Sequence, residues 1–405
     1  MPSIFEASNI DGIKLKNRII RSATGDGLAD HSGRPTKELI EFYTRLAEGG
    51  AGAIITGLTG IQQDGKSSTY HPLMLDRDDF ISDYQKLTDA VHQYDTPIIL
   101  QLNHCGRQTR QGITGKPTLA PSARRDLYFL ERRPKALSEQ EIETIIDNFV
   151  KAIRRAKKAG FDGVQLHLAH GFLLSAFLSS NTNKRTDRWG GSVENKFRII
   201  ERIFAEARKE AGKFPVLVKM NAYDTRRDGM RISEAVAIAK LLERAGCAAI
   251  EVSCGMVNDG FITVRSEKFP TEAALEFSYQ LSYLPRFVKW IIRPFVPIFT
   301  ELVVPLPKEL NLYNVGAARI IRKNVSIPII VVGGIKRLAD IESIINNHHA
   351  DYVSMSRAFI IEPDIVNRFK EGRQTESSCI SCNYCITCIE NMPFKCFHGK
   401  VESRT

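Results

Sequence analysis

Eight short apolar runs, each rich in β-branched residues, recur along the chain and constrain its fold more than any other feature. Most are followed by a segment with the spacing of an amphipathic helix. Near-continuous apolar runs are typical of parallel strands that are buried on both faces. Eight alternating strand and helix units predict an α/β fold, a (β/α)8 TIM barrel, whose active site lies at the C-terminal ends of the strands. The predicted strands are residues 19–23, 51–57, 97–102, 163–168, 216–220, 248–253, 328–333 and 351–356.

The clearest predicted helix begins at Ser138, where the sequence S-E-Q-E forms a capping box with Glu141, and it ends at Gly160. A doubly wound sheet is the alternative architecture, but no G-x-G-x-x-G motif follows an early strand. The other predicted helices span residues 36–48, 80–94, 193–212, 233–245, 310–324 and 338–347.

Composition limits the class of protein. A chain of 405 residues with 43% hydrophobic residues can bury the core of one large barrel or of two average domains. No apolar run reaches the roughly 20 residues that span a bilayer, and the N-terminus lacks the features of a signal peptide, so we expect a cytoplasmic protein. The formal charge of +10 favours an anionic ligand such as a phosphorylated cofactor or a CoA-type substrate, and we expect no nucleic-acid partner.

Glycine and arginine residues at the ends of the last two predicted strands indicate a phosphate site. Gly333 and Gly334 follow the seventh strand, and Arg357 follows the eighth. Bare backbone N–H groups can approach phosphate oxygens, and a guanidinium can pair with them. A tight turn and a surface ion pair are the alternative interpretation of the same residues.

Several motifs, in order and spacing, resemble the Old Yellow Enzyme family of FMN-dependent oxidoreductases. They are LKNRIIRSAT, QLNHCGRQ, the long AGFDGVQLHLAHGFLLSAFLSSNTNKRTDRWGGSVENKFR, IPIIVVGGI and MSRAFI. The similarity is greatest to the branch that contains bacterial 2,4-dienoyl-CoA reductase and trimethylamine dehydrogenase. It covers residues 1 to about 372, which we treat as one FMN-binding barrel. The resemblance implies that NADH or NADPH reduces FMN, which passes hydride to an activated C=C bond of a small substrate.

The resemblance also implies roles for individual residues. Gln101 and Lys219 would contact the pyrimidine edge of the flavin, where the Lys219 charge stabilises the reduced ring. His167 and His170 would hydrogen-bond the substrate carbonyl and withdraw electrons from the alkene. The remaining cofactor contacts implied are Ala23, Thr24 and Thr56 at the ring, and Gly333, Gly334, Ser356 and Arg357 at the phosphate.

One position departs from the family pattern. The family places a tyrosine two residues after the second histidine, as the acid that protonates the substrate, and this chain has Phe172 there. Because phenylalanine cannot donate a proton, Tyr223, Cys254 or water is expected to serve. Oxidative demethylation or dehydrogenation, as in trimethylamine dehydrogenase, is the alternative function.

The tail at 373–405 contains a cysteine-rich motif, CISCNYCITCIENMPFKC. The spacing of Cys379, Cys382 and Cys385 predicts soft-metal ligation, with Cys388 or Cys396 as a fourth thiolate. The resemblance favours a [4Fe–4S] cluster with Cys396 as the fourth ligand, while zinc and free thiols are the alternatives. A cluster with no downstream flavin domain implies an external electron-transfer partner.

A long insertion at about 260–310 follows the sixth strand. Its centre mixes aromatic and aliphatic residues with Arg286, Lys289 and Arg293. A lid over the flavin is the favoured interpretation, and a membrane-interface patch is the alternative. Either one predicts a bulky, apolar and unsaturated substrate. We also expect a homo-oligomer.

Overall fold

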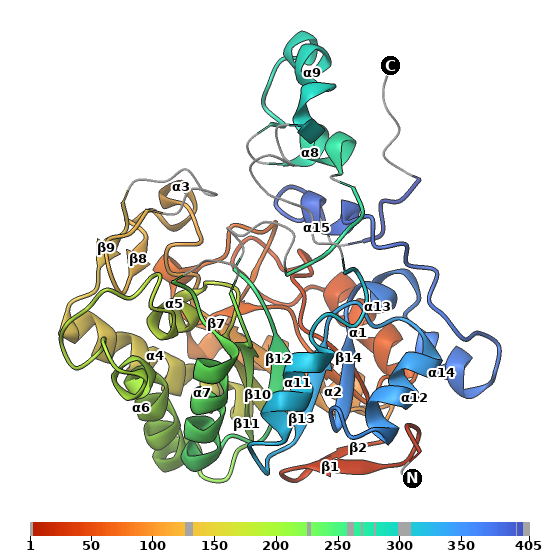
Figure 1. The fold of residues 1–405 in the computed structure, drawn as a ribbon, viewed down its shortest axis with the longest axis horizontal. Helices are drawn as coiled ribbons and strands as arrows, with labels where there is room; N and C mark the ends of the chain where they lie inside the picture. The colour runs from red at the N-terminus through yellow and green to blue at the C-terminus, as the bar shows by residue number, and fades with distance from the viewer. Residues whose placement is uncertain are drawn as a thin grey trace.

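The centre of the molecule is a closed barrel of eight parallel strands with helices around it, as the computed structural model shows (Figure 1). The structure describes residues 3–125, 133–224, 228–256, 263–268, 270–278, 281–298, 309–393 and 395–399. The pairing β7–β10 closes the sheet, and β14–β3 joins its two sequence ends. The predicted TIM barrel is therefore confirmed. Its strands are β3 Ile19–Arg21, β4 Ala53–Ile55, β7 Ile98–Asn103, β10 Gly163–Leu168, β11 Val216–Asn221, β12 Ile250–Ser253, β13 Ile329–Val332 and β14 Tyr352–Met355.

Helices follow the strands in the predicted order. The capping box at Ser138 is present, since its side chain accepts from the Glu141 N–H and Glu141 accepts from the Ser138 N–H. Two short helices after β14 were not predicted. The helices around the barrel are α1 Lys37–Glu48, α2 Ile81–His92, α4 Glu139–Lys158, α6 Val193–Ala211, α7 Ile232–Ala245, α11 Val315–Arg322, α12 Leu338–Asn346, α13 Arg357–Ile361 and α14 Ile365–Lys370.

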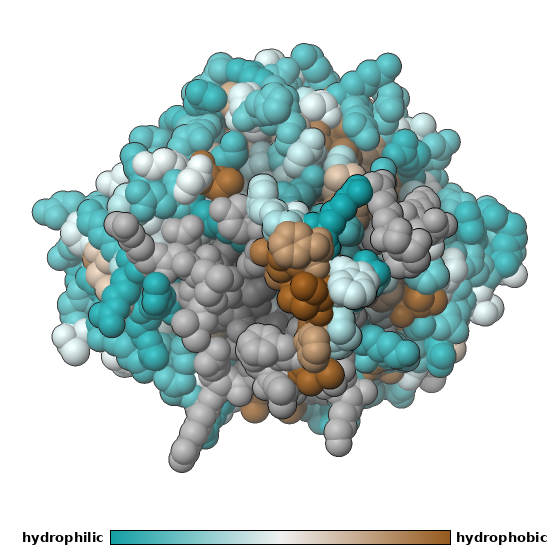
Figure 2. All heavy atoms as spheres, turned by 90° about the horizontal axis from the view of Figure 1, so that it is seen from above, coloured by the Kyte–Doolittle hydropathy of each residue, from teal (hydrophilic) through white to brown (hydrophobic). Residues whose placement is uncertain are grey.

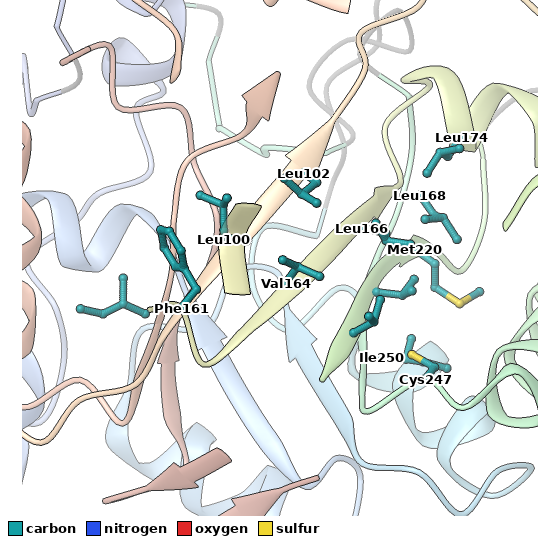
Figure 3. Close-up of a cluster of buried hydrophobic side chains, with 14 of the residues drawn as sticks. Leu100, Leu102, Phe161, Val164, Leu166, Leu168, Leu174, Met220, Cys247 and Ile250 are labelled. Carbon is teal, nitrogen blue, oxygen red and sulfur yellow. The ribbon is translucent and has the colours of Figure 1, made fainter. Parts of the chain in front are cut away.

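Alternation along each strand separates the apolar core from the polar interior of the barrel. On β10, Val164, Leu166 and Leu168 belong to the main apolar core, which packs between strands and helices (Figure 3). The residues between them, Gln165 and His167, point to the opposite face, because successive side chains of a strand alternate. Lys219 on β11 and Glu251 on β12 are likewise interior, so the barrel axis is lined by polar groups toward the C-terminal ends of its strands.

An antiparallel hairpin closes the other end of the barrel. Strands β1 Ser8–Ile10 and β2 Ile13–Leu15 pair with each other and lie below the barrel (Figure 1). Their apolar side chains join the interior residues of the lower barrel layer in a second core, which includes Ile10, Ile13, Leu15, Ile20, Ala53, Ile55, Ile99, Leu217 and Ile330. This end is filled by side chains, so the site must lie at the opposite end.

Short elements complete the described chain. Within the described ranges, no helix is long and apolar enough to cross a bilayer. Parts of the predicted insertion (260–262, 269, 279–280 and 299–308) and of the tail (394 and 400–405) lie outside the described residues. The short elements are β5 Thr59–Gly60, β6 Leu73–Met74, β8 Leu119–Ala120, β9 Lys135–Ala136, the 3-10 helices η1 Gln63–Gly65 and η2 Asp78–Phe80, α3 Gln111–Thr114, α5 Leu173–Leu178, α8 Thr271–Phe277, α9 Arg286–Ile292 and α15 Tyr384–Cys388.

The capping box of α4 gives a direct test of the helix assignment. Ser138→Ala removes the side-chain acceptor at the helix N-terminus, and we expect it to lower the free energy of unfolding by about 1 kcal/mol. Urea denaturation followed by circular dichroism measures this change. Gln140→Ala, at an exposed position of the same turn, is the matched control and is expected to be nearly neutral. Equal effects of the two substitutions would contradict the assigned role of the cap.

Candidate active site

A buried ion pair lies inside the barrel on neighbouring strands. Lys219 and Glu251 are register partners in the β11–β12 pairing. The Lys219 Nζ lies 3.4 Å from Glu251 Oε2, with the lysine side chain 5% and the glutamate side chain 0% exposed. Parallel pairing therefore fixes the position of the lysine charge relative to the carboxylate.

Hydrogen bonds from three more strands satisfy the Glu251 carboxylate. Ser22 and Ser354 hydroxyls donate to its Oε1 at 2.6 and 2.7 Å, and Gln165 Nε2 donates to Oε2 at 2.9 Å. Burial raises the pKa of Glu251, but the Lys219 charge and these hydrogen bonds outweigh it, so the net pKa is below the usual glutamate range. The carboxylate is ionised at neutral pH, and Lys219 Nζ also donates to Ser22 Oγ at 2.9 Å.

A pocket opens above this network at the C-terminal ends of the strands. Its volume is about 770 Å³, counting the part that is open to solvent. Among the described residues, its lining includes three cations, Lys219, Lys336 and Arg357, and no aspartate or glutamate. This set of charges fits a ligand that carries a phosphate or another anionic group.

Most of the predicted cofactor residues come together in this pocket. Gly333 and Gly334 have φ values of +136° and +68°, and a Cβ on Gly334 would lie 2.2 Å from the Leu310 carbonyl oxygen. The turn can therefore adopt this backbone conformation and pack this closely against Leu310 only because both residues are glycine. The predicted residues in the lining are Ala23, Thr24, His170, Lys219, Gly333, Gly334, Ser356 and Arg357.

Four of the predicted flavin-binding and catalytic residues are absent from the lining of the pocket: Gln101, Thr56, His167 and Tyr223. Gln101 and Thr56 lie in the barrel wall, where the Gln101 N–H donates to Thr56 Oγ1 at 3.1 Å. Gln101 Nε2 donates to Gln165 Oε1 at 2.7 Å, and Gln165 in turn bonds Glu251. His167 is 4% exposed. Gln101 is thus joined to the ion pair through one intervening amide.

The two predicted histidines lie next to each other. Their ring centroids are 5.0 Å apart with the planes nearly perpendicular, and His170 has a left-handed backbone with φ +64°. Burial and then the Lys219 charge lower the pKa of His170 to about 3, and burial and the neighbouring cations lower that of His167 well below its usual value. Both imidazoles are therefore neutral at physiological pH.

Hydrogen bonds orient both rings. The Ala169 N–H donates to His167 Nδ1 at 3.3 Å, so the hydrogen of this neutral ring is on Nε2. His170 Nε2 lies 2.8 Å from Ser253 Oγ, and the His170 N–H donates to Asn221 Oδ1 at 3.2 Å. Strands β10, β11 and β12 together hold the pair, which can present neutral N–H donors to a ligand.

Phe172 and Tyr223, the two residues that bear on proton delivery, have different surroundings. The Phe172 ring centroid is 4.8 Å from that of His167, so the residue at the usual tyrosine position does face the histidines. Tyr223 does not line the pocket; its hydroxyl accepts from Arg265 Nη2 at 3.1 Å and donates to the Tyr313 carbonyl oxygen at 3.3 Å. Burial and the neighbouring Cys254 raise the pKa of Tyr223, so it is protonated at neutral pH.

A second pocket adjoins the first and is lined by cysteines. Its lining includes Cys379, Cys382, Cys385 and Cys396. Cys388 instead packs in a small apolar cluster with Ala273 and Phe397. Among the residues that the structure describes, no group of three or more histidine, cysteine or acidic side chains is close enough to hold a single metal ion.

Several residues of the site were not predicted. The most important are Glu251, Gln165, Ser22 and Ser354, which form the buried network around Lys219. The one available signal was a glutamate in the otherwise small and apolar run AAIEVS, since an acid in a buried strand requires a partner.

Comparisons with known proteins place this geometry in context. Residues 3–285 and 305–376 match the sequence model of the NADH:flavin oxidoreductase / NADH oxidase family. The chain is 34% identical over 414 aligned positions to a protein named NADH oxidase from Thermoanaerobacter brockii, with 100% of this chain and 56% of that relative covered. The chain thus spans about half the length of this curated relative.

Two solved structures have a similar fold. One is 2-naphthoyl-CoA reductase in complex with 2-naphthoyl-CoA, with a TM-score of 0.82, 22% identity, and coverage of 99% of this chain and 57% of that one. The other is an old yellow enzyme homologue from Zymomonas mobilis, with a TM-score of 0.73, 25% identity, and coverage of 97% and 99%. Both similarities extend over nearly the whole of this chain.

The buried ion pair generates a prediction about stability. Glu251→Gln removes the charge partner of Lys219 and places an amide N–H₂ near the Gln165 donor, so we expect it to lower the free energy of unfolding by about 3 kcal/mol. Because the folded pKa of Glu251 is lowered, its contribution is complete above the unfolded value of about 4.3 and is lost as the pH falls further. Denaturant titrations of both proteins at pH 7 and at progressively lower pH measure the difference.

Ser354→Ala is the control, because it removes one hydrogen bond to the carboxylate and leaves the charges paired. We expect a smaller loss, about 1.5 kcal/mol. If Glu251→Gln and the wild type have the same stability at pH 7, the ion pair does not have the role assigned to it.

Proposed function

The chain belongs to the NADH:flavin oxidoreductase / NADH oxidase family, and we propose that it transfers hydride from NADH or NADPH, through bound FMN, to an activated C=C bond of an apolar small molecule. The observation that carries this proposal is that two features lie together in one pocket. In the part of the chain that the structure describes, the first pocket is lined by three cations and no carboxylate, and His170, one of two adjacent neutral imidazoles, lines it as well. The first feature suits a phosphorylated cofactor, and the second suits an uncharged electrophile.

The residues of the first pocket would hold FMN. Gly333, Gly334, Ser356 and Arg357 offer N–H, hydroxyl and guanidinium donors to a phosphate. Lys219, held by Glu251, supplies a fixed positive charge, and Ala23 and Thr24 line the same space. FMN, when bound, would supply two-electron transfer between the nicotinamide and the substrate. Thr56 and Gln101 are proposed to complete the site from the barrel wall.

The histidine pair would polarise the substrate. A neutral imidazole N–H can donate to a carbonyl oxygen without the desolvation penalty of a buried charged group. His167, whose hydrogen is on Nε2, and His170, which is oriented by Ser253, would donate to one carbonyl oxygen. Negative charge that develops on this oxygen is stabilised where it forms, and this makes the β-carbon a better hydride acceptor.

Proton delivery requires a group other than Phe172. We propose Tyr223, whose hydroxyl is protonated at neutral pH and is held in place by its neighbour Arg265. Its position outside the lining of the first pocket implies that a bridging water passes the proton to the substrate.

Substitution of the histidines tests the proposal. In His167→Ala/His170→Ala we expect FMN content to be retained and kcat/KM for an enone such as 2-cyclohexenone, with NADH or NADPH, to fall about 100-fold, because both donors to the carbonyl are lost. In the wild type, we expect no inflection of kcat/KM near pH 6.5 from these residues, since both pKa values lie well below it.

His349→Ala, outside the barrel mouth on the loop after α12, is the matched control and is expected to leave turnover unchanged. If the double variant binds flavin and turns over the enone at the wild-type rate, the histidines do not have the role proposed for them. Reduction of the flavin by an amine substrate without nicotinamide would instead favour the demethylase or dehydrogenase alternative.

We propose that the second pocket holds a [4Fe–4S] cluster on Cys379, Cys382, Cys385 and Cys396. Four thiols around one pocket match the ligand number of such a cluster. Arg357 and Cys379 line both pockets, so the cluster would be adjacent to the FMN. This arrangement suits electron exchange with an external protein partner. Separately, we propose that the protein is a homo-oligomer.

Paired cysteine variants test the ligand set. Cys396→Ala is expected to lower the iron and acid-labile sulfide content of anaerobically purified protein, because it removes one of four ligands. Cys388→Ala is the matched control and is expected to retain the cluster, since Cys388 packs against Ala273 and Phe397 outside the pocket. Iron loss in the Cys388 variant alone, or stoichiometric zinc in place of iron in the wild type, would contradict the assignment.

A further inference from the structure

A helical projection rises from the mouth side of the barrel, on the connection between β12 and α11 (Figure 1). Its first helix, α8, packs on the cysteine-rich tail, where Ala273 contacts the buried Cys388 and Phe397. Its second helix, α9, contains no buried residue. The match to the family model stops at residue 285 and resumes at 305, so α9 belongs to a segment that the family chemistry does not require.

Large apolar side chains are exposed along this projection. Six of the ten exposed large hydrophobic residues in the described chain lie between 283 and 298. The spacing of Phe287, Trp290 and Ile291 places them on one side of α9, and the other three lie just before or after this helix. We call them the apolar face: Tyr283 (76% exposed), Phe287 (67%), Trp290 (75%), Ile291 (53%), Phe295 (63%) and Ile298 (60%).

The view from above shows hydrophobic side chains gathered near the centre of this side of the molecule (Figure 2). A soluble protein seldom leaves so many large apolar side chains exposed together unless they contact a partner or a membrane. The apolar face therefore requires an occupant.

The charged residues of the projection lie on its other side. Arg293 pairs with Glu272 of α8 at 3.1 Å, and Lys289 lies 3.7 Å from Glu276. These pairs hold two basic side chains against α8, so that the apolar side chains face outward. Residues 281–298 include Arg286, Lys289 and Arg293 but no aspartate or glutamate, and Arg286 is exposed beside Phe287.

We propose that the apolar face docks on the surface of a bilayer that contains anionic phospholipid. Aromatic side chains are favoured at the boundary between headgroups and acyl chains, and aliphatic side chains enter it with them. Arg286, which is exposed beside Phe287, complements an anionic headgroup layer, whereas Lys289 and Arg293 are paired with the glutamates of α8. The chain carries a formal charge of +10, which adds a long-range attraction to the same surface.

This inference does not depend on the proposed catalytic function. It concerns residues 286–298, which lie outside the match to the family model, and it proposes that they hold the protein at a membrane surface. Docking on this side would orient the mouth of the barrel toward the membrane, since the projection rises from the ends of the strands that form the first pocket (Figure 1).

The tryptophans provide a direct readout. The chain has two, of which Trp189 is 1% exposed and Trp290 is 75% exposed. The full-length protein is mixed with vesicles of phosphatidylcholine containing roughly one third phosphatidylglycerol, and binding is measured by sedimentation and by tryptophan emission. We expect sedimentation with the vesicles and a blue shift of the emission as Trp290 enters the interface. Trp290→Phe is expected to abolish the blue shift and to retain sedimentation.

Removal of the apolar side chains tests the surface itself. In Phe287→Ser/Trp290→Ser/Phe295→Ser we expect the affinity for these vesicles to fall at least about tenfold, because the buried apolar area is lost. These side chains are exposed, so the fold is expected to persist, and circular dichroism with unchanged enone turnover verifies this. Ile113→Ser/Ile320→Ser, at exposed isoleucines elsewhere on the molecule, is the control and is expected to bind like the wild type.

Two results would overturn the proposal. One is equal binding by the triple serine variant and the wild type. The other is the absence of binding to the anionic vesicles. If the wild type is then a dimer by light scattering and the triple variant a monomer, a second copy of the chain occupies the apolar face.

Discussion

The buried carboxylate of Glu251 is the group on which the arrangement of the site depends. It receives hydrogen bonds from residues on or next to β3, β10 and β14, and it balances the charge of Lys219 on β11. A buried lysine without such a partner would carry the full cost of removing its charge from water. Because strand pairing fixes both residues, the positive charge below the first pocket is set by the backbone of the barrel and is independent of any flexible loop.

The eight strands could be predicted because each is buried on both faces, which leaves near-continuous apolar runs in the sequence. The positions of His170, Lys219, Gly333 and Arg357 around one pocket followed from the rule that barrel sites lie at the C-terminal ends of strands. The partners of these residues could not be predicted in the same way. The contact of His170 with Ser253 joins residues 83 apart in sequence, and it depends on the shear of strands that are not adjacent.

The cysteine-rich tail illustrates the same limit. Spacing alone left Cys388 and Cys396 as equal candidates, and only the path of the chain places Cys396 at the second pocket and Cys388 in an apolar cluster. Arg357, expected to serve a phosphate alone, also donates to Asn383 Oδ1 at 2.8 Å and to the Arg265 carbonyl oxygen at 2.9 Å. This guanidinium therefore ties the tail to the barrel, and it is one of two residues that line both pockets.

Because α9 lies on the β12–α11 connection, the proposed membrane contact and the chemistry of the barrel can change independently in evolution. The barrel closes through hydrogen bonds between its own strands, so a longer excursion between β12 and β13 leaves its interior unchanged. Under the proposed role of the apolar face, substitutions within residues 286–298 would change where the protein resides and leave the chemistry of its barrel as it is.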